Sequence, residues 1–424
     1  MNYATIDALL HKEVIPAIGC TEPIAVSLCV AKACEALGSN PEQMEVVLSP
    51  NIYKNAMGVG IPNTGMTGLP IAVALGAVAG KSEYGLEVLK DADEAAVEQA
   101  KLYMQSTPIK IEIDYQTEQI LYISVTVSCG SDTATATIEG AHTNFVHISR
   151  NGQTLFSGTN SGSCAEQSEQ EPSLTLKQVY EYATTVPLEQ IEWLKRAEEM
   201  NIGAAEVSFT GGYGHGLGRL MHKNAKESIF GDTLFTKILS YTSGACDARM
   251  SGAMVPVMSN SGSGNQGISA TVPVVIFGRE KGVSEEQLLR ALALSHLTVV
   301  YIKQSLGRLS ALCGCVVAAT GSSCGITYLM GGEFKEVSYA VKNMVANLTG
   351  MICDGAKPSC SLKVTSGVST AVLSAVLAIE QRYTTSLEGI IDEDVDKCIA
   401  NLTNIGRNGM RETDKLILKI MTDK

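Results

Sequence analysis

The amino-acid sequence predicts an α+β fold in which a large, mainly helical body carries a smaller antiparallel β-rich subdomain. Polar residues alternate with β-branched or aromatic ones across residues 108–158, which is the pattern of half-buried strands. Long helical patterns separated by glycine-rich loops fill most of the remaining sequence. The chain has 424 residues, more than a single hydrophobic core organises. We therefore expect three units: an N-terminal helical part of the body (1–107), the β-rich subdomain (108–165) and the C-terminal helical body (166–424).

The elements follow one another in a clear order along the chain. A helical pattern over residues 5–37 is interrupted at "IGCTEP", a strand-like stretch follows at 44–50, and residues 69–104 are helical again. The expected strands of the β-rich subdomain are "IKIEIDY", "ILYISVTVSC", "TATATIEG", "HTNFVHISR" and "QTLFSG". Helical patterns resume at residue 174. Aromatic residues make up only 5% and glycine occurs 40 times, so we expect the helices to approach one another closely.

Composition excludes several classes of partner. The net charge is −12 and no run of Lys and Arg occurs, which argues against nucleic-acid binding. Three stretches of low charge, at 56–80, 252–278 and 309–330, are long enough to cross a bilayer, but they are rich in Gly, Ser, Thr, Asn or Pro. We interpret them as buried elements of a protein without a membrane partner. The N-terminus lacks the pattern of a signal peptide, so we expect a cytoplasmic protein.

One glycine-rich segment resembles a cofactor-binding motif only superficially. "SGSGNQG" at 261–267 has the GxGxxG spacing, but the segment after it is β-branched and contains a proline rather than opening a dinucleotide-binding helix. A turn, or a nest of backbone amides for an anionic group, is the better interpretation. The six histidines show no metal-binding spacing, and no GxSxG motif is present.

The twelve cysteines contain the strongest chemical signal, because a reducing compartment favours metal binding or catalysis over disulfides. Cys20 precedes Thr21, the expected N-cap of a helix, and the positive end of a helix dipole favours a thiolate there. Cys353 and Cys360 flank a turn with Gly355 and Pro358 in "MICDGAKPSCSLK". Their spacing is wide for zinc, whereas iron–sulfur clusters tolerate irregular spacings. Spacing alone leaves a metal or cluster site and unrelated core thiols both open.

Several separated motifs together resemble one protein family. "PAIGCTEPIAVSLCVAKA", "NIYKNAMGVGIPNTGMTGLPIAVALGA", "LGRLSALCGC", "TYLMGG" and "MICDGAKPSCSLKV" are similar to motifs of the L-cysteine desulfidase family. These proteins are pyridoxal-independent iron–sulfur lyases, akin to the α-subunit of iron–sulfur L-serine dehydratases. The resemblance extends from about residue 10 to residue 365, and it predicts an enzyme whose substrate is a small amino acid.

The resemblance also implies the roles of individual cysteines. It implies a [4Fe–4S] cluster held by three cysteines, of which Cys353 and Cys360 match the "CDGAKxxC" ligands. The third ligand comes from "LSALCGC", where we choose Cys313 and keep Cys315 as the alternative. Cys20 of "GCTEP" is implied as the base. The implied reaction is β-elimination of L-cysteine to pyruvate, ammonia and sulfide, with the open cluster iron as Lewis acid.

The glycine-rich loops supply the expected substrate contacts. We expect Asn55, Ser261, Gly262 and Gly264 to present backbone amides or polar side chains to the substrate carboxylate and amine, the alternative being that these glycines serve only close helix contact. Lys357 and Arg308 could offset the negative charge of a cluster or remain solvated surface groups.

Three other functions stay open at this point. L-serine dehydration could use the same cluster, and a non-catalytic metal or redox sensor could use the same thiols. A pyridoxal-phosphate lyase would need Lys54 or Lys303 as its imine lysine, although no phosphate-binding motif surrounds either residue. The glycine-rich apolar faces also predict a homodimer.

Overall fold

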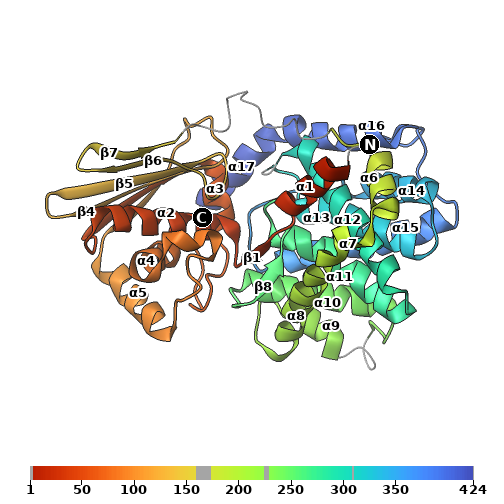
Figure 1. Ribbon diagram of the computed structural model, residues 1–424, viewed down its shortest axis with the longest axis horizontal. Coiled ribbons are helices and arrows are strands. Elements are labelled where there is room, and N and C mark those ends of the chain that lie inside the picture. Colours follow the sequence, from red (N-terminus) through yellow and green to blue (C-terminus); the bar gives the residue numbers. More distant parts are fainter. Residues whose placement is uncertain (1–2, 159–172, 224–228, 308–309, 424) are drawn as a thin grey trace.

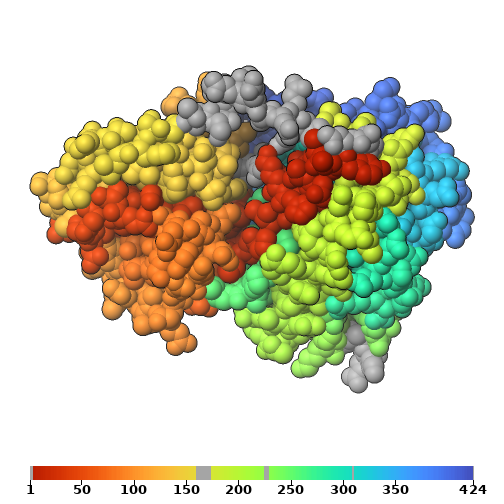
Figure 2. Space-filling view, viewed as in Figure 1, coloured from red at the N-terminus to blue at the C-terminus, as the bar shows by residue number. Residues whose placement is uncertain are grey.

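The computed structural model describes residues 3–158, 173–223, 229–307 and 310–423 and has two lobes joined side by side (Figure 1). One lobe consists of a single sheet with helices against it, and the other is a larger helical body. The α+β prediction is therefore confirmed. In the space-filling view the N-terminal segment runs across the junction between the lobes (Figure 2).

The sheet lobe contains six strands in the order β3-β2-β4-β5-β6-β7. Their bounds are β2 Gln43–Leu48, β3 Ile109–Ile113, β4 Tyr122–Cys129, β5 Asp132–Glu139, β6 Phe145–Arg150 and β7 Gln153–Ser157. β2 pairs with β3 in parallel, and the other neighbours are antiparallel. The strand-like stretch at 44–50 thus joins the strands of the β-rich segment, because β2 inserts between β3 and β4.

Alternation along the central strands leaves one face of the sheet apolar. In β4, Ile123, Val125 and Val127 are fully buried, while Ser124 and Thr126 on the other face make hydroxyl contacts with β5. The apolar face shares a core with α2 (Thr21–Leu37), α4 (Leu69–Ala79) and α5 (Glu94–Ser106). The short elements of this lobe are α3 (Pro50–Ala56) and η1 (Ser82–Glu87). Residues 24–148 therefore contribute to one hydrophobic core.

The helical body forms around a second core, to which residues 6–14 and 174–402 contribute. Its longer helices are α1 Tyr3–Glu13, α6 Leu176–Thr185, α8 Lys195–Thr210, α10 Leu234–Met250, α11 Gly264–Lys281, α12 Glu285–Leu306, α13 Gly314–Leu329, α14 Phe334–Leu348, α15 Cys360–Ile379, α16 Val395–Asn404 and α17 Arg411–Thr422. Its short elements are α7 Leu188–Ile191, η2 Glu192–Leu194, α9 Leu217–Lys223 and η3 Ile405–Gly409.

Glycine brings the central helices close together, as the composition predicts. A Cβ on Gly321 of α13 would lie 2.3 Å from the Ser295 carbonyl oxygen of α12, so no larger residue fits there. The low-charge stretches contribute buried helices: α4 lies within 56–80, α13 lies within 309–330, and most of α11 falls in 252–278. Among the described helices, α15 is long and apolar enough to span a membrane, and it contacts α10, α13 and α14 inside the body.

Three contacts join the two lobes. β1 (Pro16–Ile18), which follows α1 of the body, pairs with β8 (Pro256–Met258) before the chain enters α2 of the sheet lobe. The Thr21 hydroxyl donates to the Gly262 carbonyl at 3.0 Å. Lys54 of α3 forms an ion pair with Asp414 of α17. The first turns of α2 and α11 therefore lie next to each other at the junction.

Candidate active site

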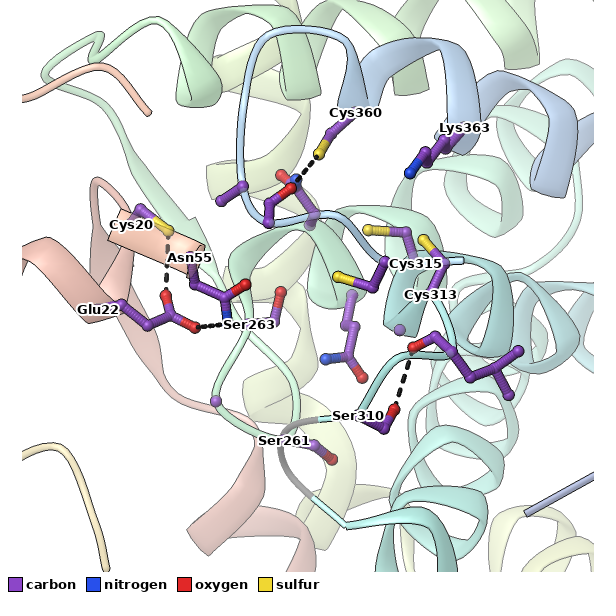
Figure 3. Close-up of a pocket in the computed structure, with 18 of the residues that line it drawn as sticks. Cys20, Glu22, Asn55, Ser261, Ser263, Ser310, Cys313, Cys315, Cys360 and Lys363 are labelled. Atoms are coloured by element: carbon purple, nitrogen blue, oxygen red, sulfur yellow. Dashed lines mark hydrogen bonds between the residues drawn. The ribbon is translucent and has the colours of Figure 1, made fainter. Parts of the chain in front are cut away.

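A pocket with a cavity volume of about 90 Å³ lies at this junction and receives residues from both lobes (Figure 3). The volume is small beside the roughly 300–1,000 Å³ of pockets for drug-sized ligands, which favours a small metabolite. The lining comes from the first turn of α2, the end of α3, the start of α11 and the loops before α13 and α15. Cys20, Cys313, Cys315, Cys353 and Cys360 all line it.

Two of the predicted cluster ligands lie on neighbouring backbone segments. The Cys313 amide donates to the Met351 carbonyl at 2.9 Å, and the Cys353 amide donates to the Ala311 carbonyl at 2.6 Å. An antiparallel bridge between Leu312 and Ile352 lies between these two bonds. The structure thus connects "LSALCGC" to "MICDGAKPSC", which are about forty residues apart in the sequence.

The turn in "CDGAKPSC" brings Cys360 to the same pocket. Gly355 has φ +86°, and a Cβ there would lie 2.1 Å from the Lys54 carbonyl oxygen, so only glycine fits. Cys360 is the first residue of α15. Lys357 and Lys363 both pair with Asp354 and hold the loop backbone through bonds to carbonyl oxygens.

Burial and neighbouring charges set the protonation of these thiols. Burial raises the pKa of Cys353, and it raises the pKa of Cys360 to about 11. A hydrogen bond from the Cys315 thiol lowers the pKa of Cys313, with the Lys363 ammonium acting in the same direction. Without a metal, Cys353 and Cys360 are therefore protonated at neutral pH, and binding a metal would release their protons.

The donor set fits a cluster better than a single ion. Among the described residues, no group of three or more His, Cys, Asp or Glu is arranged around one point as a lone metal ion requires. Several soft thiols nevertheless line one pocket, with Lys363 beside them. The ligands of an iron–sulfur cluster bind separate corners and are further apart than ligands of one ion. The residues present thus fit a polynuclear group.

Cys20 lies on the sheet-lobe side of the pocket, directly before α2. It occupies the N-cap position that we expected for Thr21, which instead begins the helix. The Cys20 thiol donates a hydrogen bond of 3.1 Å to Oε2 of Glu22. Burial raises the pKa of the Cys20 thiol, and the Glu22 carboxylate raises it further. The lowering expected from the helix dipole alone is therefore wrong, because desolvation outweighs it.

Of the four predicted substrate-contact residues, three line the pocket and one is not among the described lining residues. Asn55, Ser261 and Gly262 line the pocket, and the Asn55 amide donates to Oε1 of Glu22 at 3.2 Å. Gly264 is not part of the described lining. It lies beneath the pocket wall, where a Cβ would be 2.2 Å from Nε of Arg249.

Arg249 is a lining residue that sequence reasoning missed. It is 2% exposed, and its Nη1 donates to Asn265 Oδ1 at 3.1 Å. Its Nε and the Oε1 of the neighbouring Gln266 have no hydrogen-bond partner among the described residues. A buried guanidinium that lines a pocket is suited to bind a carboxylate.

Other lining residues that we did not predict include Glu22, His142 and Lys363. "GCTEP" contains Glu22 in plain view, so its proximity to Cys20 could have been noticed. Lys303, one of the two possible imine lysines, is also at the pocket, whereas Lys54 is paired with Asp414. Arg308 lies outside the described residues.

Comparisons with known proteins give matches over most of the chain. The profile of the family described as serine dehydratase alpha chain matches residues 83–419. A UPF0597 protein of Bacteroides fragilis is 62% identical over 419 residues, covering 99% of this chain and 98% of the relative. UPF0597 proteins of Bacteroides thetaiotaomicron and Porphyromonas gingivalis are 61% and 52% identical, covering 98% and 99% of this chain and 97% and 98% of their own lengths.

Proposed function

The chain belongs to the serine dehydratase alpha chain family of iron–sulfur lyases, and from this premise we propose that it eliminates sulfide from L-cysteine to form pyruvate and ammonia. The observation that carries the proposal is the meeting of three elements in one small pocket. These are the thiols of "LSALCGC" and "MICDGAKPSC", the Cys20 thiol and the buried side chain of Arg249.

We assign Cys313, Cys353 and Cys360 as ligands of a [4Fe–4S] cluster. When bound, such a cluster supplies a Lewis-acidic iron that stabilises the leaving sulfur. Lys363 lies beside these thiols and offsets part of the added negative charge. The high pKa of Cys360 implies that cluster binding becomes weaker as pH falls, because protons compete for the thiolates.

The other lining residues bind the amino acid and move its proton. Arg249 pairs with the substrate carboxylate, and the 261–263 loop faces the same space. Cys20 takes the Cα proton, on the side of the pocket formed by the sheet lobe. Loss of the Cα proton and of the β-substituent leaves an enamine, which hydrolyses to pyruvate and ammonia. Reduced thiols suit the cytoplasmic location that we propose.

L-Serine is the second candidate substrate, because the family's description names serine. Purification under anaerobic conditions, followed by cluster reconstitution, allows iron, labile sulfide and pyruvate to be measured with each amino acid. We expect pyruvate to form faster from L-cysteine than from L-serine. The amount of sulfide released from L-cysteine should equal the amount of pyruvate. A protein that holds no iron after reconstitution contradicts the cluster, whereas pyruvate from serine alone contradicts the cysteine assignment.

Matched variants localise the site. Cys353→Ser and Cys360→Ser should each lose most of the iron, because a serine hydroxyl is a poor ligand for this metal. Cys129→Ser is the control, since Cys129 ends β4 in the sheet lobe and does not line the pocket among the described residues. Equal iron in all three variants would contradict the ligand assignment.

A further inference from the structure

Glu22 is the buried carboxylate of this pocket, and it belongs to the first turn of α2. It is 8% exposed, and three side chains point donors at it, although the Thr21 hydroxyl shares its one proton between Glu22 and the Gly262 carbonyl. Oε2 accepts from the Cys20 thiol at 3.1 Å and from the Thr21 hydroxyl at 3.1 Å, while Oε1 accepts from Asn55 Nδ2 at 3.2 Å. Figure 3 shows the Cys20–Glu22–Asn55 chain along one wall of the pocket.

The direction of these hydrogen bonds matters for catalysis. Asn55 holds Oε1, so Oε2 faces Cys20. A thiol that donates to a carboxylate still carries its own proton and cannot take another. For Cys20 to accept the Cα proton it must first release the one it holds, and the carboxylate oxygen at 3.1 Å is where that proton already points.

We propose that Glu22 accepts the proton of Cys20 and that the two residues act together as the base of the elimination. The inference rests on the proposed function and extends it to a residue with no role so far. The S–H bond of Cys20 breaks, an O–H bond forms on Glu22, and sulfur keeps the electron pair. That pair then forms an S–H bond with the Cα proton.

The remaining electrons also balance. The Cα–H pair becomes the Cα–Cβ double bond, and the Cβ–S pair leaves with the sulfur of the substrate. The proton on Glu22 passes to the departing sulfide or to water, which restores the carboxylate, and Cys20 is again a thiol. The transfer follows a hydrogen bond that already exists, because the Cys20 thiol donates to Oε2 at 3.1 Å, and the negative charge stays within the pair.

A purely structural role for Glu22 makes different predictions. A carboxylate in the first turn of a helix stabilises it through the helix dipole, and Thr21 links Glu22 to the Gly262 carbonyl region. In that case Glu22→Gln would lower stability and iron content while the enzyme that remains loaded would turn over normally. The test therefore compares activity per bound cluster.

The variants are Glu22→Gln, which keeps the shape but cannot take a proton, and Glu22→Asp, which can. Glu35→Gln is the matched control: Glu35 is on the same helix, about 20 Å further along its axis, and accepts hydrogen bonds from Ser82 and Lys32 outside the pocket. We expect Glu22→Gln to lower kcat per cluster by about 10²–10⁴-fold with little change in KM. Glu22→Asp should recover part of the rate, and the Cα-deuterium isotope effect should rise in Glu22→Gln.

A second measurement needs no cluster and no turnover. The S–H stretching band of Cys20 can be assigned in the metal-free protein by difference infrared spectroscopy against Cys20→Ser. We expect a hydrogen-bonded band in the wild type that moves to higher frequency in Glu22→Gln, because a neutral amide accepts more weakly than a carboxylate. An unmoved band overturns the proposed pair even if the proposed function holds.

Two kinetic outcomes also overturn the inference. Normal kcat per cluster in Glu22→Gln means that the carboxylate is not needed. Exchange of the Cα proton with solvent that persists in Cys20→Ala but disappears in Glu22→Gln means that Glu22 acts on the substrate directly. If the wild type turns over neither cysteine nor serine, the proposed function fails, and the infrared band still decides the pair.

Discussion

His296 should make the helical body less stable in mild acid. Its ring lies in α12 and is fully buried. Nδ1 accepts from Asn260 Nδ2 at 3.0 Å, and Nε2 contacts the Thr271 hydroxyl at 3.0 Å. Because that hydroxyl donates to the Gly267 carbonyl, Nε2 carries the hydrogen and the ring is neutral. Burial lowers the pKa of His296 to about 3.

The size of the effect follows from proton linkage. An unfolded histidine has a pKa of about 6.5, so between this value and about 3 the unfolded chain binds a proton that the folded chain does not. The free energy of unfolding therefore falls as pH drops through this window and levels off near its lower end. At about pH 5 the loss amounts to about 2 kcal/mol relative to neutral pH.

The assay uses the lone tryptophan, Trp193, which belongs to the helical body. Denaturant midpoints of the metal-free protein are measured by its fluorescence at neutral pH and near pH 5, for the wild type and for His296→Gln. Glutamine can replace both hydrogen bonds but does not titrate. We compare denaturation midpoints rather than fluorescence intensities. The centroid of the His11 ring lies 4.4 Å from that of the Trp193 ring, so this neighbour can itself affect the intensity of the emission.

The difference between the two proteins isolates His296, since all other titrating groups are common to both. The wild type should lose about 2 kcal/mol more than the variant on acidification. An equal loss in both proteins would refute the reasoning, because it would mean that His296 is protonated, or solvated, in the folded state.

Three further predictions concern glycine and cysteine positions. Gly203→Ala in α8 should raise stability by about 0.5–1 kcal/mol, since nothing lies within 4 Å of the new Cβ; a lower denaturant midpoint would contradict this. Gly264→Ala should displace the Arg249 guanidinium and raise KM about tenfold or more; an unchanged KM would argue against Arg249 as the carboxylate group. Cys313→Ala should lose iron and Cys315→Ala should retain it, because Cys313 is on the segment bridged to Cys353; the reverse result in an iron assay would exchange the two roles.

Local chemistry made part of this molecule predictable. The α+β class followed from alternation in the strands and from helical periodicity elsewhere, both of which depend on near neighbours. The turn between Cys353 and Cys360 was also recognisable from Gly355 and Pro358, and the structure gives Gly355 a positive φ and a close backbone contact that demand glycine. The strands at 44–50, β3 and β4 were all visible in the sequence, but the insertion of β2 between β3 and β4 was not, since strand pairing is decided by distant segments.

The parts that escaped prediction depend on distant contacts or on burial. Arg249 gave no signal in "DARMSG", and only the folded chain reveals that this buried guanidinium lines the pocket. His142 reaches the pocket from the loop between β5 and β6, which no motif connects to cysteine chemistry. The pKa of Cys20 was assigned in the wrong direction, because a helix terminus is visible in sequence whereas desolvation is not.

Under the proposed function, the placement of the pocket makes the junction between the lobes part of the catalytic apparatus. Cys20, Glu22 and Asn55 belong to the sheet-lobe side, while Arg249 and the thiols that we propose as cluster ligands belong to the helical body. Neither set can carry out the proposed elimination alone, because the base and the leaving-group site must face one substrate. Thr21 bonds to both Glu22 and the Gly262 carbonyl, so the residue that fixes the proton acceptor also fixes the distance between the halves. Any displacement at this junction would separate the base from the thiols while leaving the chemistry of each half intact. Such a displacement would therefore lower kcat strongly and reduce the cluster content only a little.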